Sequence, residues 1–284
     1  MVGSCNYDVI AYVERRPEPG DSVRARGIRL DCGGKGFNQA VALRRLGAEV
    51  EMCGAVGEDW FGGEFRRRLD ELGIGRRFLK SVERLTGIAM PVVDAAGENA
   101  IVHALGANLE LTPDDVQPAA FSGADAVLLQ GELRAETTAR AAELGRSMDR
   151  LVVLNLAPAD PSLRGALHDA DVAVVNRAEA AQLGGPGQLL AAGVDAVVVT
   201  MGAGGAEIHA QRPETVAAPE VEVVDTTGAG DAFAAALTLA LVEGRSLQEA
   251  AAWAAAAGAA ACMREGTSSA MPARDEVEEL FRRR

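Results

Sequence analysis

The chain has 284 residues, of which 48% are hydrophobic and 24% are charged, as in an ordinary globular protein. Its net charge of −13 argues against a nucleic-acid partner, because such binding depends on lysine and arginine neutralising phosphates. The N-terminus lacks the features of a signal peptide, and the most apolar late stretch, Ala251–Met263, is shorter than the ~20 residues of a membrane span, so we expect no membrane partner either.

Short runs rich in Val, Ile and Leu alternate with helical patterns along most of the chain. The strand candidates are Glu49–Val56, Ala126–Gln130, Leu151–Leu154, Val172–Val175 and Val194–Thr200, and the helical stretches include Gly62–Leu72 and Thr137–Met148. This alternation predicts an α/β fold with a central, mostly parallel sheet and helices on both of its faces. Ligands of such sheets bind at the carboxyl ends of the strands.

The first polar motif in the chain is Gly3-Ser-Cys-Asn6-Tyr-Asp8, which we place at the end of the first strand. An amide and a carboxylate so close together can each bind a vicinal hydroxyl of a polyol. The same residues also suit a turn held by asparagine and aspartate side chains. The pattern alone does not separate these two interpretations.

Two segments break the alternation and are predicted to be strands outside the main sheet. Asp21–Asp31 alternates apolar and basic residues, and Gly87–Ala104 contains the hairpin signal Asp94-Ala-Ala-Gly97. Together they would form a small β lid over a cleft, inserted at about residues 10–32 and 86–105 of a single domain that spans residues 1–284. Alternatively, they are surface hairpins without a role.

A glycine-rich motif follows the first of these segments. It reads DCGGKGFNQA over Asp31–Ala40 and opens a helix that we expect to run to about Leu46. Three glycines and Lys35 at a helix start predict a polar pocket wall rich in backbone groups, in which Asn38 can bind sugar hydroxyls. The spacing is not that of a Walker A motif.

Two further motifs follow strand candidates in the second half of the chain. Asn176-Arg-Ala-Glu179 can order magnesium or phosphate, but an asparagine with a glutamate three residues later is also a capping box. Thr200-Met-Gly202-Ala-Gly204-Gly205 can line an adenine pocket. It is not a dinucleotide fingerprint, because the residues after it are predicted to form a strand rather than a helix.

The strongest signal is the segment VEVVDTTGAGDAFAAAL, which spans residues 221–237. A strand-like run ends at Asp225, a glycine-rich turn follows, and a long apolar helix continues from Ala232. The N–H groups of such a turn, together with the positive end of the helix dipole, form a cradle for an anion.

Asp231 lies directly after this cradle. If the N–H groups of Gly228, Ala229 and Gly230 hold a phosphoryl group, Asp231 can accept the proton of an attacking hydroxyl. Taken alone, the same four residues also suit a capped helix after a tight turn.

The two glycine motifs stand in the order found in the ribokinase family, also called the phosphofructokinase-B (pfkB) type of carbohydrate kinase. The chain resembles this family over nearly its whole length, and the two motifs together are highly specific. Three further segments resemble the ribokinase branch more than fructokinases or adenosine kinases. They are Gly3–Asp8, Gly106–Asn108 and Asn155–Ala159.

The resemblance implies a three-layer sandwich with a β lid and an ATP-dependent phosphotransferase that acts on a sugar hydroxyl, with D-ribose as the first substrate to consider. It implies Mg²⁺ with ATP as cofactor. The alternatives are a kinase of another sugar, a sugar phosphate or a nucleoside, and a non-catalytic sugar- or nucleotide-binding protein. A sugar phosphate would need further cations, for which Arg29 and Lys35 are candidates.

The resemblance also assigns roles to individual residues. Asp231 would be the catalytic base, with the anion hole formed by Gly228, Ala229 and Gly230. The sugar would be bound by Asn6, Asp8, Gly34, Lys35, Asn38, Glu132 and Asp231. The nucleotide would be bound by Asn176, Glu179, Thr200, Gly202, Gly204, Gly228 and Gly230, and Glu179 would act on Mg²⁺ through water. A monovalent cation such as K⁺ would be bound by Asp225, Thr227 and carbonyls near Ala261, Arg264 and Gly266.

The sequence departs from the family pattern at three positions. Phe37 replaces a small residue and is expected to narrow the sugar pocket or to shift its specificity. Ala255 stands near the position where ribokinases often have a histidine beside adenine. Ala270 stands where a hydroxyl often completes the cation shell, which puts activation by potassium in doubt.

Two expectations concern assembly and location. Lid strands with one exposed face often pair with a second copy, so we expect a homodimer through Asp21–Asp31 and Gly87–Ala104. The four cysteines include no C-x-x-C pair and are expected to be reduced thiols of a cytoplasmic protein.

Overall fold

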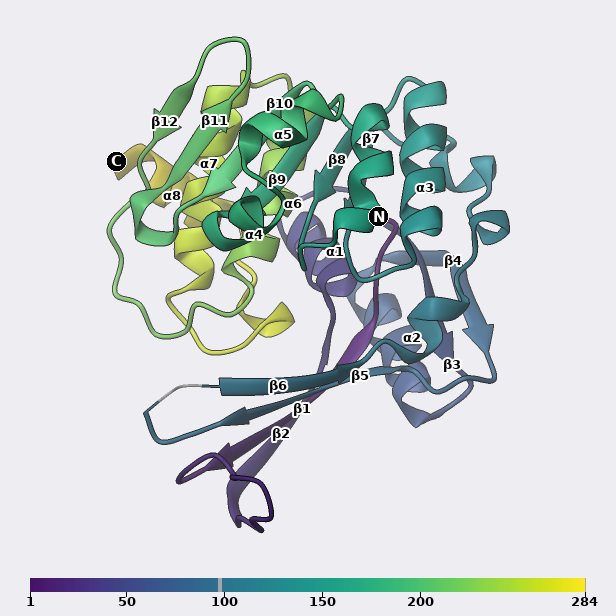
Figure 1. Cartoon of the computed structure of the whole chain (residues 1–284), viewed down its shortest axis with the longest axis vertical. Helices are drawn as coiled ribbons and strands as arrows, with labels where there is room; N and C mark the ends of the chain where they lie inside the picture. The colour runs from purple at the N-terminus through teal and green to yellow at the C-terminus, as the bar shows by residue number, and fades with distance from the viewer. Residues whose placement is uncertain (97–98, 284) are drawn as a thin grey trace.

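The computed structural model describes residues 1–96 and 99–283, and it has helices on both faces of a central sheet (Figure 1). Along one part of this sheet the strands are β7 (Ala126–Gln130), β8 (Leu151–Asn155), β9 (Val172–Asn176), β10 (Ala196–Thr200), β11 (Ala206–His209) and β12 (Glu214–Val216). The first four of these strands run parallel, and the last two are antiparallel.

The N-terminal residues join this group of strands to a second, parallel pair, β3 (Glu51–Gly57) and β4 (Gly75–Val82). The N–H of Val2 donates to the carbonyl oxygen of Leu128 in β7 at 3.2 Å, and Val2 forms a parallel bridge with Cys53 in β3. The sheet therefore continues across the N-terminal segment.

The layers follow from the alternation of side chains along each strand. Val127 and Leu129 of β7 pack on one core, and Leu128 packs on the other. The first core is covered by α3 (Ala135–Ser147), α4 (Arg177–Gln182) and α5 (Pro186–Ala191), and the second by α1 (Lys35–Arg45), α6 (Ala229–Val242) and α7 (Leu247–Ala261). This is the predicted three-layer α/β sandwich.

Two further helices also pack on the second core. α2 (Trp60–Leu72) adds Phe65 and Leu69 to it and contacts β3 and β4, and α8 (Arg274–Arg283) adds Val277 and Leu280 and contacts α7. The short 3₁₀ helices are η1 (Gly106–Glu110), η2 (Pro113–Asp115), η3 (Pro118–Phe121), η4 (Pro161–Asp169), η5 (Gly202–Gly204) and η6 (Ser268–Ala270). None of the helices in the described part of the chain is long and apolar enough to cross a lipid bilayer.

A separate four-stranded sheet projects from this body at the bottom of Figure 1, and we call it the lid sheet. Its strands, in spatial order, are β2 (Ala25–Gly33), β1 (Asn6–Val13), β5 (Gly87–Val93) and β6 (Asn99–Ala104). The prediction that Asp21–Asp31 and Gly87–Ala104 contain strands outside the main sheet is confirmed. β5 and β6 pair antiparallel as the hairpin signal predicts, although Gly97 of that signal lies outside the described residues.

Two local predictions are wrong. Asn6 and Asp8 do not end a first strand but begin β1, because the chain leaves the main sheet after Val2 and enters the lid sheet at Asn6. The strand expected to end at Asp225 is irregular, since the N–H groups of Val224 and Asp225 donate to the carbonyl oxygen of Cys262 at 2.8 and 3.2 Å instead of to a neighbouring strand.

Candidate functional site

The turn Gly228–Gly230 lies between two cavities at the carboxyl edge of the main sheet. The first cavity has a volume of about 590 Å³ and is lined by Gly228 and Asp231, together with lid-sheet residues such as Tyr12. The second has a volume of about 510 Å³ and is lined by Ala229 and Gly230. One turn therefore forms part of the wall of both cavities.

Two amide side chains from the start of α1 hold the carboxylate of Asp231 in place. Asn38 Nδ2 donates to Oδ2 of Asp231 at 3.0 Å, and Gln39 Nε2 donates to Oδ1 at 2.9 Å. Burial raises the pKa of Asp231, while Lys35 and these two amides partly oppose the rise. The result is a fixed carboxylate with an increased affinity for a proton.

A chain of buried amides orients Gln39 in turn. Gln39 Nε2 donates to Asn155 Oδ1 at 3.0 Å, and its Oε1 accepts from Gln130 Nε2 at 2.7 Å. Gln130 and Asn155 are the last residues of β7 and β8, so the sheet itself fixes this network. No role was expected for Gln39, Gln130 or Asn155 from the sequence. The signal for Gln130 and Asn155 is a polar residue at the end of a buried strand, and Gln39 follows Asn38 in the glycine-rich motif.

The glycine turn offers free N–H groups at the start of α6. Gly228 has a left-handed φ of 79°, which a glycine adopts without strain. The N–H of Ala229 donates to the carbonyl oxygen of Thr226 at 3.3 Å, so it is engaged within the turn rather than free as expected. Within residues 1–96 and 99–283, the N–H groups of Gly228, Gly230 and Asp231 have no hydrogen-bond acceptor, so these three are available to bind an anion.

Glu132 is the centre of a hydrogen-bond network in the wall of the first cavity. Its Oε2 accepts from Asn6 Nδ2 at 3.3 Å, from the backbone N–H of Lys35 at 2.9 Å and from the hydroxyl of Ser4. Asn108 Nδ2 donates to Asn6 Oδ1 at 2.8 Å and fixes the orientation of that amide. All the predicted sugar residues line the first cavity, namely Asn6, Asp8, Gly34, Lys35, Asn38, Glu132 and Asp231.

Asp8 is a second carboxylate of this cavity, and its side chain lies against Gly33. A Cβ atom at Gly33 would fall 2.2 Å from Oδ2 of Asp8, so the glycine leaves room for the carboxylate. Burial, together with the carboxylates of Asp31, Glu132 and Asp231, raises the pKa of Asp8 to about 7. Asp8 therefore titrates near neutral pH.

Lys35 provides a positive charge beside these acids. Burial alone would lower the pKa of its ammonium group, but the carboxylates of Asp231, Glu132 and Glu179 outweigh burial and raise the pKa above its usual value. Lys35 therefore stays charged at neutral pH, and its positive charge interacts with the carboxylate of Asp231.

The second cavity is mainly apolar. Thr200 and Gly202 line it as expected, but Gly204 does not, and Gly205 lines it instead. The reason is that Gly204 turns toward Met201, where a Cβ atom on Gly204 would lie 3.3 Å from Met201 Cβ. The remaining wall is largely composed of small or apolar residues, including Val221, Val223, Phe233, Ala255, Gly258 and Ala259.

Asn176 and Glu179 form the capping box that was one of the two interpretations of their motif. Asn176 Oδ1 accepts from the N–H of Glu179, and Glu179 Oε2 accepts from the N–H of Asn176, both at 2.8 Å. Neither residue lines either cavity. Burial raises the pKa of Glu179, and the N–H of Asn176 and the charge of Lys35 oppose this rise. The carboxylate of Glu179 therefore interacts electrostatically with Lys35. A role of Glu179 toward magnesium stays a prediction.

The residues expected to bind a monovalent cation are engaged with one another. Oδ1 of Asp225 accepts from the N–H and the hydroxyl of Thr227 at 2.9 and 2.6 Å, and Oδ2 accepts from the N–H of Gly266 at 3.1 Å. These hydrogen bonds outweigh burial and hold the pKa of Asp225 below its usual value. Ala270 is buried and has no oxygen in its side chain, so this donor set does not fit the expected cation shell.

Phe37 does not narrow the sugar cavity, contrary to expectation. Its ring has 0% exposure and packs edge-to-face on Phe65, with ring centroids 5.1 Å apart and an interplanar angle of 83°. It points from α1 into the core and is absent from the cavity lining. The bulk of this side chain therefore serves packing.

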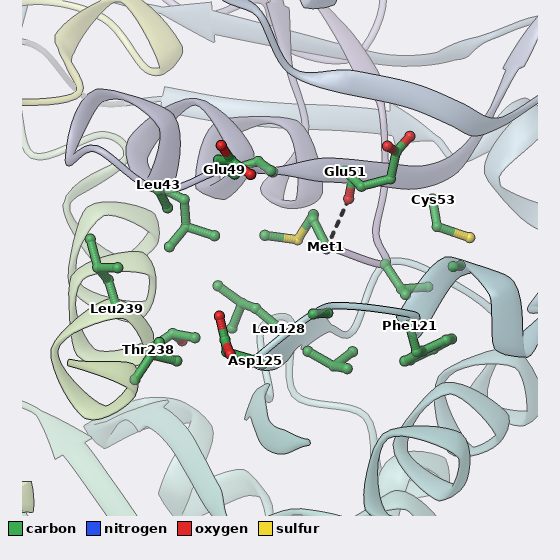
Figure 2. Close-up of a pocket in the computed structure, with 18 of the residues that line it drawn as sticks. Met1, Leu43, Glu49, Glu51, Cys53, Phe121, Asp125, Leu128, Thr238 and Leu239 are labelled. Atoms are coloured by element: carbon green, nitrogen blue, oxygen red, sulfur yellow. Dashed lines mark hydrogen bonds between the residues drawn. The ribbon is translucent and has the colours of Figure 1, made fainter. Parts of the chain in front are cut away.

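A third cavity, of about 380 Å³, lies at the opposite edge of the main sheet, where β3 and β7 begin (Figure 2). Figure 2 shows Met1 between Glu51 and Leu128, with its amino group donating to the carbonyl oxygen of Glu51 at 3.0 Å. No predicted site residue lines this cavity.

In the described residues, no cluster of three or more His, Cys, Asp or Glu side chains could hold a metal ion.

Comparisons with known proteins agree with the geometry. The family model for pfkB family carbohydrate kinases matches residues 1–274. The chain is 35% identical over 287 residues to the ribokinase of Bacillus subtilis, covering 99% of this chain and 98% of that protein. It is 32% identical over 299 residues to the deoxyribokinase of Salmonella typhi, covering 99% and 97%. The structure of Arabidopsis thaliana ribokinase complexed with ribose and ATP matches with a TM-score of 0.89 and 31% identity, covering 99% of this chain and 97% of that one.

Proposed function

Because this chain belongs to the pfkB family of carbohydrate kinases, we propose that it transfers the γ-phosphoryl group of ATP to a ribose-type pentose, with the 5-hydroxyl of D-ribose as the first candidate. The observation that carries the proposal is the turn Gly228–Gly230, which borders the polar cavity on one side and the apolar cavity on the other. The sugar would bind in the first cavity and the nucleotide in the second. The relatives named ribokinase and deoxyribokinase support a pentose as the acceptor.

The reaction follows from the positions of the side chains. The sugar hydroxyl attacks the γ-phosphorus and loses its proton to Asp231, and the bond between the γ-phosphorus and the bridging oxygen breaks to release ADP. The free N–H groups of Gly228, Gly230 and Asp231 would hold the phosphoryl oxygens, and Lys35 would offset their charge. The raised pKa of Asp231 makes it a better proton acceptor than an exposed carboxylate.

We propose Mg²⁺ bound to ATP as the cofactor. Magnesium keeps several waters and is usually held by phosphates with only one or two carboxylates. Glu179 is suited to act through water, because its Oε2 is engaged in the capping box and its charge interacts with Lys35 and Asp231. The ion would neutralise charge on the phosphates.

The charges of the first cavity favour a neutral acceptor over a sugar phosphate. Its lining includes the acidic residues Asp8, Glu132, Asp225, Asp231 and Glu265. Besides His103, its basic residues are Lys35, which interacts with the candidate base, and Arg29, which is paired with Asp31 at 3.1 Å. A second phosphate would therefore meet mainly negative charge.

Release of ADP across a panel of acceptors tests this function. We expect turnover with D-ribose or 2-deoxyribose and much less with ribose 5-phosphate, hexoses or nucleosides. Preference for a nucleoside or a hexose would move the substrate assignment to one of the alternatives. Thermal stabilisation by sugar and nucleotide without any ADP release would instead favour a non-catalytic binding protein.

We also propose that residues 1–284 act as one kinase domain, with a lid from segments at about 10–32 and 86–105 that closes on the sugar. Lid-sheet residues such as Ile10, Tyr12 and Ile101 support this, because they line the first cavity.

We further propose a cytoplasmic location, which is supported by the four cysteines, since all of them are free thiols.

A homodimer through the lid sheet is a further proposal. One face of the lid sheet lines the first cavity. The opposite face carries exposed apolar side chains, including Ile28 at 67%, Val102 at 64% and Leu30 at 52% exposure. A sheet face of this kind is typical of a surface that a second copy covers.

Replacing two of these residues should separate the dimer. Leu30→Glu combined with Val102→Glu places charges on the shared face, so we expect a dimer for the unchanged chain and a monomer for the variant in light scattering. Val242→Glu, which alters an exposed apolar residue at the end of α6, is the matched control and should leave the assembly unchanged. A monomeric unchanged chain at micromolar concentration would contradict the proposal.

A further inference from the structure

We propose that the guanidinium group of Arg29 supplies the positive charge at the junction of the Asp225 and Gly266 loops, so that activity does not require a monovalent cation. The inference rests on the proposed kinase function for its activity test. It concerns the predicted cation ligands, whose arrangement does not match the expected cation shell.

Arg29 connects the lid sheet to the loop that follows α7. It lies on β2 and lines the sugar cavity. Its Nη2 donates to the hydroxyl of Ser269 at 2.8 Å and to Oδ2 of Asp31 at 3.1 Å. The guanidinium lies against Gly266, since a Cβ atom on that residue would fall 2.6 Å from Nη2. Glycine at position 266 therefore leaves the room that the guanidinium occupies.

A potassium ion would have to compete with contacts that are already formed. Both carboxylate oxygens of Asp225 accept hydrogen bonds from Thr227 or Gly266. The charge of Arg29 acts on the same carboxylate. An ion placed between these loops would share the oxygens of Asp225 with these N–H and O–H donors and would lie near a fixed positive charge, which repels it.

The position of Arg29 links the lid to the anion cradle. Arg29 contacts Ser269 and Gly266, Gly266 donates to Asp225, and Asp225 holds Thr227 directly before Gly228. The other charged or titratable groups that interact with the guanidinium are Asp31, Tyr12 and Asp8. We therefore assign Arg29 a positioning role, in which its charge and its hydrogen bonds keep the two loops together.

The experiment compares K⁺ with tetramethylammonium at a constant ionic strength of about 0.1 M. In the unchanged chain, we expect kcat and the unfolding temperature to differ little between the two salts, by less than about twofold for kcat. In Arg29→Ala, we expect kcat in tetramethylammonium to fall about tenfold with less change in KM for the sugar, because a charge-assisted contact is lost. Addition of K⁺ should then restore part of the rate and raise the unfolding temperature.

Two further variants serve as controls. Arg29→Lys keeps the charge and should retain more activity than Arg29→Ala. Arg26→Ala removes an arginine from the same strand that pairs with Glu14 and does not line the cavity, so it should behave as the unchanged chain in both salts.

Specific outcomes would overturn the inference. A K⁺-specific rise in the unfolding temperature of the unchanged chain, or a large K⁺-dependent rise in its kcat, would show that an ion binds there after all. An Arg29→Ala variant that folds, keeps full activity and shows no response to K⁺ would contradict the role of Arg29. If no sugar is turned over in any salt, the proposed function fails, while the unfolding temperatures still test the inference.

Discussion

Asp231→Asn is expected to lower kcat by about three orders of magnitude, because an asparagine cannot accept the proton of the sugar hydroxyl. The shape of the site should be kept, since Gln39 can still donate to the single side-chain oxygen of an asparagine. Asn38, whose Oδ1 is buried without a hydrogen-bond partner among the described residues, can turn its amide to accept from the new NH2 group. Affinity for ATP should change little, because the second cavity is lined by other residues.

Single-turnover kinetics and nucleotide titration separate these two effects. Asp195→Asn is the matched control, since Asp195 is an exposed acid that pairs with Arg146, precedes β10 and lines neither cavity, so its replacement should leave kcat unchanged. An Asp231→Asn enzyme with more than about a tenth of the normal kcat would remove Asp231 from its role as base.

Asp8→Asn is expected to weaken sugar binding and, at alkaline pH, to stabilise the fold. A neutral amide accepts a hydrogen bond from a hydroxyl less strongly than a carboxylate does, so KM for the sugar should rise by about tenfold to a hundredfold.

The effect on stability follows from the pKa of Asp8, which rises from 3.8 to about 7 on folding. The folded protein therefore binds this proton more tightly, and the associated stability is lost as pH rises from about 4 through 7. The variant should be more stable at pH 8 by on the order of 2 kcal/mol.

Two pH profiles check this prediction. In the unchanged enzyme, KM for the sugar should rise as pH falls below 7, because Asp8 becomes protonated, whereas the Asp8→Asn profile should be flatter. Urea unfolding at pH 5 and pH 8 should show the stabilisation mainly at pH 8. Equal stability of the two proteins at pH 8 would mean that Asp8 is not the source of this destabilisation.

Local patterns predicted most of the framework. Short apolar runs rich in Val and Leu marked β7 to β10, because buried parallel strands need continuous apolar sequence. The glycine motifs marked the starts of α1 and α6, because only small residues allow the backbone to approach so closely there, as at Gly36, where a Cβ atom would lie 2.4 Å from the backbone N of Ser4. The predicted sugar residues meet in one cavity because these helix starts and the lid sheet converge on it.

Other features depend on contacts that are distant in the sequence. Arg29 and Ser269 are 240 positions apart, and Gln39 reaches Asn155 across 116 positions. The direction of the Phe37 side chain depends on where α1 packs on Phe65. The valines before Asp225 have high strand propensity, but the N–H of Val224 binds Cys262 instead, so tertiary contacts override propensity there.

In the proposed reaction, a phosphoryl group passes from one cavity to the other across the turn Gly228–Gly230. Incubation with ATP labelled at the γ-phosphate, followed by separation of the products, shows where this group goes. We predict that the label moves to D-ribose or 2-deoxyribose in a one-to-one ratio with ADP. Label released as inorganic phosphate, or ADP formed without a labelled sugar, would contradict the account.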